Sequence, residues 1–252
     1  MIVDEIAERI LELIDPSKIR VVDYGIGLRY SYVLIDYKGR NYIGLSHTLH
    51  SYLRSFHYKD TEIDPGQLVE LVSSINPYDK QYGHALLNAM SQYIVLEDKE
   101  HRLINDKDPD DLVDIRRDDL VVFIGDIKPL VDRVKSINEN VYVFEEDICR
   151  RGKVYPAGYE FRVLQDADIV FMTGSVLTND TFDVVLSYAR RAREKIMVGP
   201  SAQIVPWLLG DKVTVIASIL VLDPWRVRDV IVRGGGTRAI NRYSRKYIYR
   251  NI

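Results

Sequence analysis

The spacing of apolar residues in the first third of the chain predicts a helix, then strands. Apolar side chains from Ile2 to Ile14 recur every three or four positions, which predicts an amphipathic helix ending before Pro16. Three strand-like runs follow between residues 18 and 49, separated by glycine-containing turns. Connections this short favour an antiparallel meander, because parallel strands need long crossovers.

Two more helices are predicted after these strands, at about residues 65–75 and 79–95, the second with an apolar face. The next segment, 97–119, is crowded with charge and has few apolar residues to bury, which is typical of a connection between domains. We therefore expect an N-terminal α+β domain over residues 1–105.

From residue 120 onward the pattern becomes an alternation of strands and helices. Continuous apolar runs predict strands at 120–125, 141–145, 167–174, 195–199 and 213–221. Helices are expected between them, including one at about 179–193 and one that Asp223 and Pro224 begin. Successive strand–helix units indicate a Rossmann-like, doubly wound parallel sheet over residues 106–252, so the fold class is α/β.

The composition indicates the class of protein and its expected location in the cell. Hydrophobic residues make up 46% and charged residues 28%, as in ordinary globular proteins, and the net charge is −3. No apolar run approaches the roughly 20 residues that span a bilayer. Acidic residues within the first helix are unlike a signal peptide. We expect a soluble cytoplasmic protein without a membrane partner.

The single cysteine, Cys149, excludes an internal disulfide and a zinc site built from several thiolates. Acidic residues precede it, and they would raise a thiol pKa rather than activate the group. We expect Cys149 to have a structural or incidental role.

The carboxyl ends of parallel strands are where ligands bind in such sheets. The first strand ends at Gly125 and Asp126, with one glycine where a dinucleotide fingerprint has three. Glu145 ends the second strand, 20 residues after Gly125. That offset suits an acid bonded to ribose hydroxyls, but a merely solvated loop explains it equally well.

Small polar residues follow the third and fourth strands. They are Thr173, Gly174, Ser175, Asn179 and Thr181 after the third, and Gly199, Pro200 and Ser201 after the fourth. These hydroxyl and amide groups exceed what one helix cap needs, and helix N-termini favour anions. The two strand ends therefore predict one shared polar pocket.

The segments MTGSVLTNDT, VGPSAQIVPWLL and LDPWRVRDVIVRGGGTRAI occur in that order. They resemble the C-terminal domain of the family named "putative heavy-metal chelation". IGLSHTL and YGHALLNAM are similar to the family's N-terminal domain. The resemblance implies an enolase-N-terminal-like domain joined to a Rossmann-like one. It also implies an interdomain cleft for a metal chelate or similar small molecule.

The resemblance also implies a set of site residues. These are Asn88, Gly125, Glu145, Thr173, Asn179, Thr181, Gly199, Pro200, Ser201, Gly235, Gly236 and Thr237. Asn88 is expected either at the surface, in an interdomain hydrogen bond, or as a polar group in the cleft.

Metal ligation and cofactors stay open at this point. The five histidines are His47, His50, His57, His84 and His101, and no HExxH pattern joins any of them. A metal carried inside a bound chelate would need no protein ligands.

The C-terminal segment is strongly basic. From Arg226 to Arg250 eight basic residues accompany one acid, Asp229, with tyrosines between them. The pattern fits nucleic-acid binding or a charged, exposed edge strand, and the negative net charge favours the edge strand. Gly234–Thr237 is expected to form either a backbone nest for an anion or a hinge.

The favoured hypothesis is a cleft that binds or processes a small anionic or metal-chelating molecule, with Glu145 or Asp126 as the acid–base group. The first alternative is a nucleotide- or S-adenosylmethionine-dependent enzyme, and the second is a nucleic-acid-binding module, which we consider disfavoured. Whether the protein is an enzyme stays open. Its 17 tyrosines are compatible with a homo-oligomer.

Overall fold

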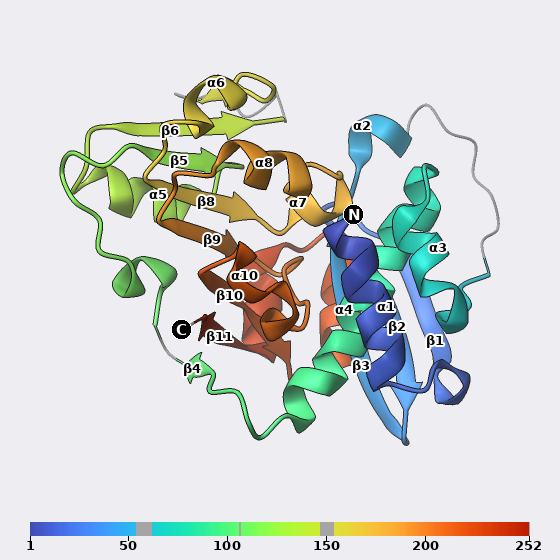
Figure 1. Cartoon of the computed structure of the whole chain (residues 1–252). Coiled ribbons are helices and arrows are strands. Elements are labelled where there is room, and N and C mark those ends of the chain that lie inside the picture. The colour runs from blue at the N-terminus through green and yellow to red at the C-terminus, as the bar shows by residue number, and fades with distance from the viewer. Residues whose placement is uncertain (54–61, 106, 147–153, 252) are drawn as a thin grey trace.

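The computed structural model of the protein describes residues 1–53, 62–105, 107–146 and 154–251, which form two lobes side by side (Figure 1). The N-terminal lobe contains α1 (Ile2–Leu13), η1 (Pro16–Lys18), β1 (Arg20–Ile26), β2 (Tyr30–Tyr37), β3 (Arg40–His47), α2 (His50–Leu53), η2 (Pro65–Gln67), α3 (Leu68–Ser73) and α4 (Pro77–Glu97). Its three strands pair antiparallel in the order β1-β2-β3, so the predicted meander is confirmed.

The second lobe holds the remaining elements. They are β4 (Ile104–Asn105), η3 (Pro109–Leu112), β5 (Val121–Ile124), α5 (Lys128–Lys135), β6 (Val141–Glu145), β7 (Tyr155–Pro156), α6 (Phe161–Leu164), β8 (Ile169–Thr173), α7 (Ser175–Thr178), α8 (Phe182–Tyr188), β9 (Glu194–Val198), η4 (Pro206–Lys212), β10 (Val215–Val221), α9 (Pro224–Val232), α10 (Thr237–Ile240), η5 (Asn241–Tyr243) and β11 (Ser244–Arg250). The predicted α/β class is confirmed.

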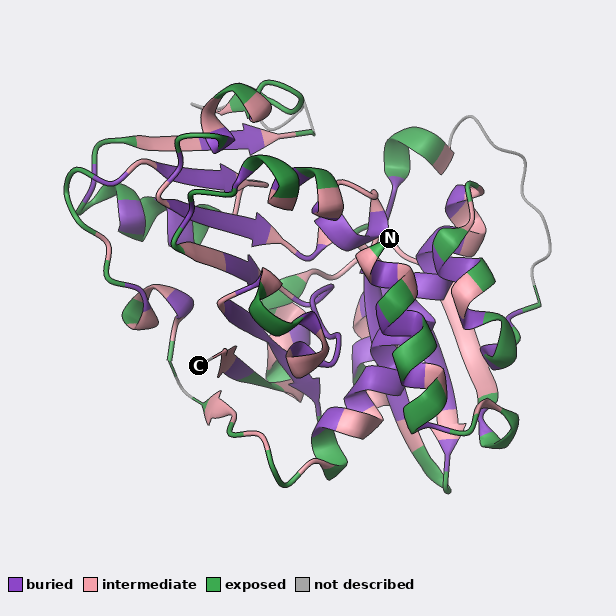
Figure 2. Ribbon diagram, in the orientation of Figure 1, coloured by how far each residue is buried: buried purple, intermediate pink, exposed green. Residues whose placement is uncertain are grey.

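Helix α4 lies across one face of the meander at very short range. A Cβ on Gly44 of β3 would overlap backbone atoms of Ala85 and Ala89, and would lie 2.6 Å from the carbonyl carbon of Asn88. Only glycine fits this contact, which explains the glycine in the IGLSHTL strand. Most of α4 is buried, because it is covered from several sides (Figure 2).

The opposite face of the meander packs on the second lobe. Leu34 and Leu45 share a buried cluster with Ile219 of β10 and with Val227 and Ile231 of α9. The meander is thus enclosed between α4 and α9, and the two lobes share their hydrophobic interior.

The sheet of the second lobe has the strand order β4-β11-β10-β9-β8-β5-β6-β7. The strands from β10 to β7 are parallel, and chain order reverses between β5 and β8. Leu130 and Val134 of α5 pack on one face with Phe123. Residues of α6, α7 and α8 pack on the other, Phe182 among them. Helices on both faces make this sheet doubly wound, as predicted.

The expectation that the C-terminal strand is a sheet edge is wrong over its centre. β11 lies between β10 and the short β4, where Tyr247 is paired with Asn105 and Ile248 with Ile104. Tyr247 and Ile248 point to opposite faces, and both are buried. At these two residues β11 has a paired strand on each side, so it lies inside the sheet there.

The helix expected at about 179–193 is present but shorter, because α8 spans only Phe182–Tyr188. A separate helical turn, α7 (Ser175–Thr178), precedes it, and Asn179–Thr181 join the two. Asp180 has φ 60°, and this left-handed conformation interrupts a helix.

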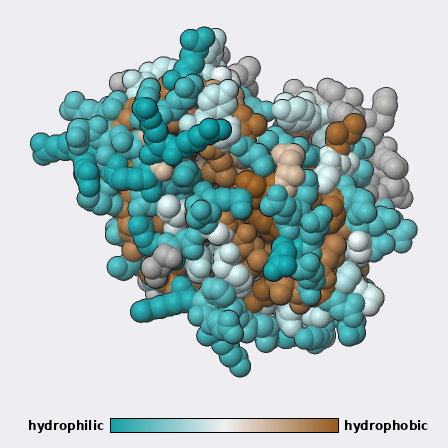
Figure 3. All heavy atoms as spheres, viewed as in Figure 1, coloured by the Kyte–Doolittle hydropathy of each residue, from teal (hydrophilic) through white to brown (hydrophobic). Residues whose placement is uncertain are grey.

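The molecular surface is polar around the periphery. On the face shown in Figure 3, hydrophobic residues show mainly in the central band where the lobes meet. Among the described residues, no helix is long and apolar enough to cross a membrane.

Candidate functional site

The carboxyl ends of β5, β6 and β8 point toward the N-terminal lobe (Figure 1). Chain order reverses between β5 and β8, and a crevice for ligands forms at such a switch point. Gly125 follows β5 with φ 95°, and a Cβ there would lie 2.5 Å from Cγ2 of Thr173. The first and third strand ends therefore touch, and glycine is required at their contact.

The two candidate acids lie together at the next strand end. The backbone N–H of Asp126 donates to Oε2 of Glu145 at 3.0 Å. Both residues are half-buried. The structure thus brings the two predicted acid–base residues together at the neighbouring ends of β5 and β6.

The polar residues of the third and fourth strand ends also meet. The hydroxyls of Thr173 and Ser175 are hydrogen-bonded to each other. Gly174 faces Ser201, because a Cβ on Gly174 would lie 2.6 Å from the carbonyl carbon of Ser201. The single shared pocket that we predicted has the adjacency it requires.

Asn179 and Thr181 close their own loop. The side chains of Asn179 and Thr181 are 2.7 Å apart, which caps the turn between α7 and α8. Asp180 between them forms an ion pair with the mostly buried Lys80 of α4. The loop is therefore fastened to the N-terminal lobe, and Asn179 shapes it from within.

The turn after β9 faces open space. Gly199 has φ 118°, and a Cβ there would have no neighbouring atom within 4 Å. The carbonyl oxygen of Gly199 accepts a hydrogen bond from the Ser218 hydroxyl at 3.0 Å. Pro200 and Ser201 turn inward and are buried.

Asn88 ties the two lobes together beneath this turn. Its Nδ2 donates to the carbonyl oxygens of Leu45, at 2.6 Å, and Ser201, at 3.0 Å. Gln203 accepts the N–H of Leu45 at 2.8 Å. Asn88 is only 1% exposed, and its Oδ1 has no hydrogen-bond partner. Of our three expectations for Asn88, the interdomain hydrogen bond describes its position.

Sequence reasoning missed the buried glutamines around this joint. Gln92 donates to the carbonyl of Ile219 and accepts the N–H of Val221, where β10 has run past its partner β9. Gln81 accepts bonds from Ser31 and Leu49. The sequence did contain a signal for this joint. Gln81, Asn88 and Gln92 lie seven and four residues apart in one apolar helix, which places their side-chain amides on one face.

Helix α2 stands opposite the end of β6. The negative charge of Glu146, together with burial, raises the pKa of the Tyr52 hydroxyl. The Tyr52 hydroxyl therefore lies close to the Glu146 carboxylate. The N-terminal lobe therefore reaches over the strand ends at this point.

The glycine run after α9 lies elsewhere, against the β1–β2 hairpin. The amides of Gly234 and Gly235 donate to the carbonyls of Ile231 and Val230 and close the end of α9. These two amides are engaged, so the predicted four-residue nest does not form as expected. Gly236 packs against Arg29.

The described histidines are dispersed. Burial lowers the pKa of His84 to about 3. His101 stacks on Trp207 and contacts Asp98. His47 ends β3, and His50 begins α2. His57 and Cys149 lie outside the described residues. Within the described part of the chain, no group of three or more His, Cys, Asp or Glu is placed to hold a metal ion.

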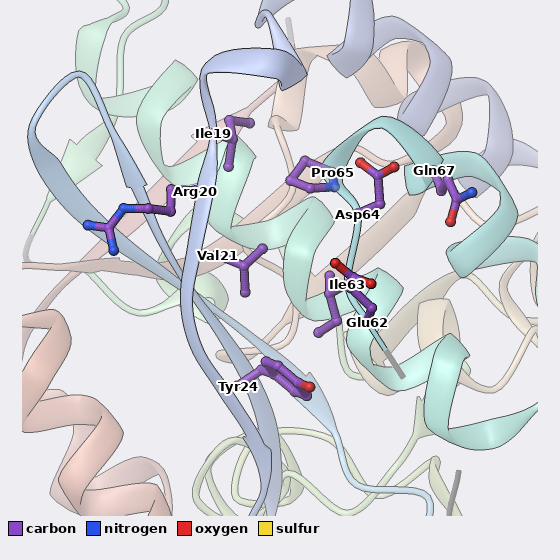
Figure 4. Close-up of a pocket in the computed structure, with 9 residues that line it drawn as sticks. All are labelled: Ile19, Arg20, Val21, Tyr24, Glu62, Ile63, Asp64, Pro65 and Gln67. Carbon is purple, nitrogen blue, oxygen red and sulfur yellow. The ribbon is translucent and has the colours of Figure 1, made fainter. Parts of the chain in front are cut away.

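A separate surface cavity of about 630 Å³ opens on the N-terminal lobe, between β1 and residues 62–67 (Figure 4). Tyr24, Glu62 and Asp64 contribute to it, and Arg20 extends away from the others. None of the predicted site residues lines this cavity, so it belongs to a different surface from the strand ends.

Two family models match the chain, both described as "Putative heavy-metal chelation", over residues 7–91 and 108–250. The chain belongs to this family. A protein of Methanocaldococcus jannaschii described as uncharacterized is 36% identical over 234 residues, which is 88% of each chain.

Two solved structures from the same family, both of proteins described as having unknown function, share the fold. The Pyrococcus horikoshii protein has a TM-score of 0.86 at 26% identity, over 99% of this chain and 100% of its own. The Desulfitobacterium hafniense protein has a TM-score of 0.77 at 18% identity, over 98% of both chains, and supports the fold alone.

Proposed function

We propose that the protein binds a small anionic or metal-chelating molecule at the carboxyl ends of β5, β6, β8 and β9. The observation that carries this proposal is the contact at the switch point. There Gly125 touches Thr173, and Gly174 touches Ser201. Four strand ends thus gather hydroxyls, carboxylates and an open glycine turn under one overhanging helix, α2.

The chemistry of these groups suits orientation of a polar ligand. The Thr173 and Ser175 hydroxyls can each donate or accept a hydrogen bond. Glu145 and Asp126 would accept a hydrogen bond from a ligand N–H or O–H, and either would serve as acid–base group if the ligand is also transformed.

A metal in this site would enter as part of the ligand. The described residues provide no cluster of three ligating side chains, whereas a chelate brings its own donors. In this proposal the protein recognises the outer oxygens of the chelate, and the metal is cargo.

Native mass spectrometry with elemental analysis on gently purified protein tests the proposal. We expect a stoichiometric small-molecule adduct, lost in the double variant T173V/S175A and retained in S187A, which removes an exposed hydroxyl of α8. A bare mass for the wild type, with no thermal stabilisation by citrate or by its zinc or nickel complexes, would contradict the proposal.

A nucleotide or S-adenosylmethionine is the second candidate, on one observation. Glu145 ends the strand beside β5, where an acid binds ribose hydroxyls in dinucleotide sites. Against it, Pro129 removes an N–H from the first turn of α5. Thermal-shift measurements with adenosyl cofactors decide between the candidates.

A further inference from the structure

The tip of the β1–β2 hairpin and the turn between α9 and α10 are packed into one surface. A Cβ on Gly27 would lie 2.6 Å from Cγ2 of Ile231. The hydroxyls of Tyr30 and Thr237, 207 residues apart in sequence, are 2.7 Å apart. The hairpin tip is therefore held against the glycine turn by both packing and a hydrogen bond.

An arginine lies across the glycine of this turn. The position of a Cβ on Gly236 is 2.7 Å from Cδ and 3.1 Å from Nε of Arg29. Gly236 has an ordinary φ of −121°, so its backbone does not require glycine. The absence of a side chain at 236 instead makes room for the stem of Arg29.

The charge of this surface is unbalanced. Residues 223–246 carry seven basic and two acidic side chains, a net charge of +5 in a chain whose total is −3. Arg29 and Arg238 are exposed, and in the described part of the chain neither forms an ion pair. Ion pairs of Arg228 with Asp23 and of Lys246 with Asp108 neutralise part of this charge. The charges of Arg29 and Arg238 remain, and they attract anions.

We propose that Arg29, Arg238 and the hydroxyls of Tyr30 and Thr237 form an oxyanion site, separate from the strand ends, for the carboxylate or phosphate group of a small molecule. The planar guanidinium binds two oxygens of such a group at once. Because one of the two hydroxyls donates to the other, the second hydroxyl donates to a remaining oxygen. The glycine at 236 is needed because it positions Arg29.

Calorimetric titration of the full-length protein with pyrophosphate and with citrate tests this site, at low ionic strength because exposed charges are screened by salt. We expect one site on this surface, in addition to any citrate bound at the strand ends, and the better of the two probes shows whether it takes phosphate or carboxylate. R29Q should weaken binding by about tenfold or more. The matched control R117Q removes an exposed arginine elsewhere and should leave binding unchanged.

The variant G236A separates geometry from charge. It keeps every charged group but forces Arg29 aside, so the proposal expects weaker binding with an unchanged melting temperature. T173V/S175A, which removes the site of the proposed function, should keep the binding that R29Q loses.

Four results would overturn the proposal: no binding of either probe, equal losses in R29Q and R117Q, full affinity in G236A, or loss of binding in T173V/S175A. The last result would place the anion at the strand ends and support the proposed function instead.

Discussion

Replacing Asn88 with alanine tests the joint between the lobes. Asn88 donates to two buried carbonyls, one on β3 of the N-terminal lobe and one on the turn after β9. Alanine fills the same place in α4 without a clash and favours the helix, so the variant removes little besides the two hydrogen bonds.

The expected cost follows from these two bonds. A buried acceptor that loses its donor costs about 1–3 kcal/mol, so two acceptors cost about 2–6 kcal/mol. The variant also removes the buried Oδ1 of Asn88, which has no hydrogen-bond partner, and this offsets part of the cost. We therefore expect the free energy of unfolding to fall by about 2–4 kcal/mol. For a chain of this size 1 kcal/mol corresponds to about 2–4 °C, so we expect the melting temperature to fall by roughly 4–16 °C.

Differential scanning calorimetry measures this change, with the exposed Asn140→Ala as control. Hydrogen exchange followed by mass spectrometry shows which segments are destabilised. Peptides that contain Leu45 and Ser201 should exchange faster in N88A, while those of α5 and β6 should not. A melting temperature within about 1 °C of the wild type would refute the assignment of Asn88 as the tie between the lobes.

Two further predictions concern α4. Gly44→Ala would place a Cβ inside the backbone of α4, so we expect urea unfolding to show a free energy of unfolding lower by about 3 kcal/mol or more. The control Gly66→Ala should change it little, and a loss below about 1 kcal/mol in Gly44→Ala would contradict the close contact. Burial holds the pKa of His84 at about 3, against about 6.5 when unfolded, so unfolding takes up a proton below pH 6.5. His84 therefore lowers the free energy of unfolding as pH falls from 6.5 toward 3, by up to about 1.4 kcal/mol per pH unit. The urea midpoint of H84Q should depend less steeply on pH than that of the wild type. Equal slopes would show that His84 is not the group responsible.

The spacing of apolar residues along the chain predicted much of the fold. The apolar runs ending near Gly125, Glu145 and Thr173 are strands because a parallel strand is buried on both faces and must be apolar throughout. The adjacency of the strand ends followed as well, since parallel strands finish at one edge of the sheet. Glu145, Thr173 and Ser201 could therefore be assigned to one region before their distances were known.

The local sequence pattern did not predict how two C-terminal segments are paired. The C-terminal strand was expected at an edge because its charges are conspicuous, yet the short β4 covers Tyr247 and Ile248. The glycine run was expected to form an anion nest or a hinge, whereas the amides of Gly234 and Gly235 close α9 through bonds to Ile231 and Val230. The partner of β11 comes from a distant part of the chain and has no periodic signal of its own, while the bonds that close α9 are local and depend on the turn that the glycines adopt.

The sequence by itself determined the order of elements, the α/β class and which residues stand at the strand ends, because these depend on spacings of two to four residues. Only the tertiary structure decided that Asn88 and Gln203 hold β3, and that Arg29 lies over Gly236. Those pairings join residues more than 40 positions apart. They arise from how two packed lobes satisfy their buried polar groups, which the spacing along the chain does not encode.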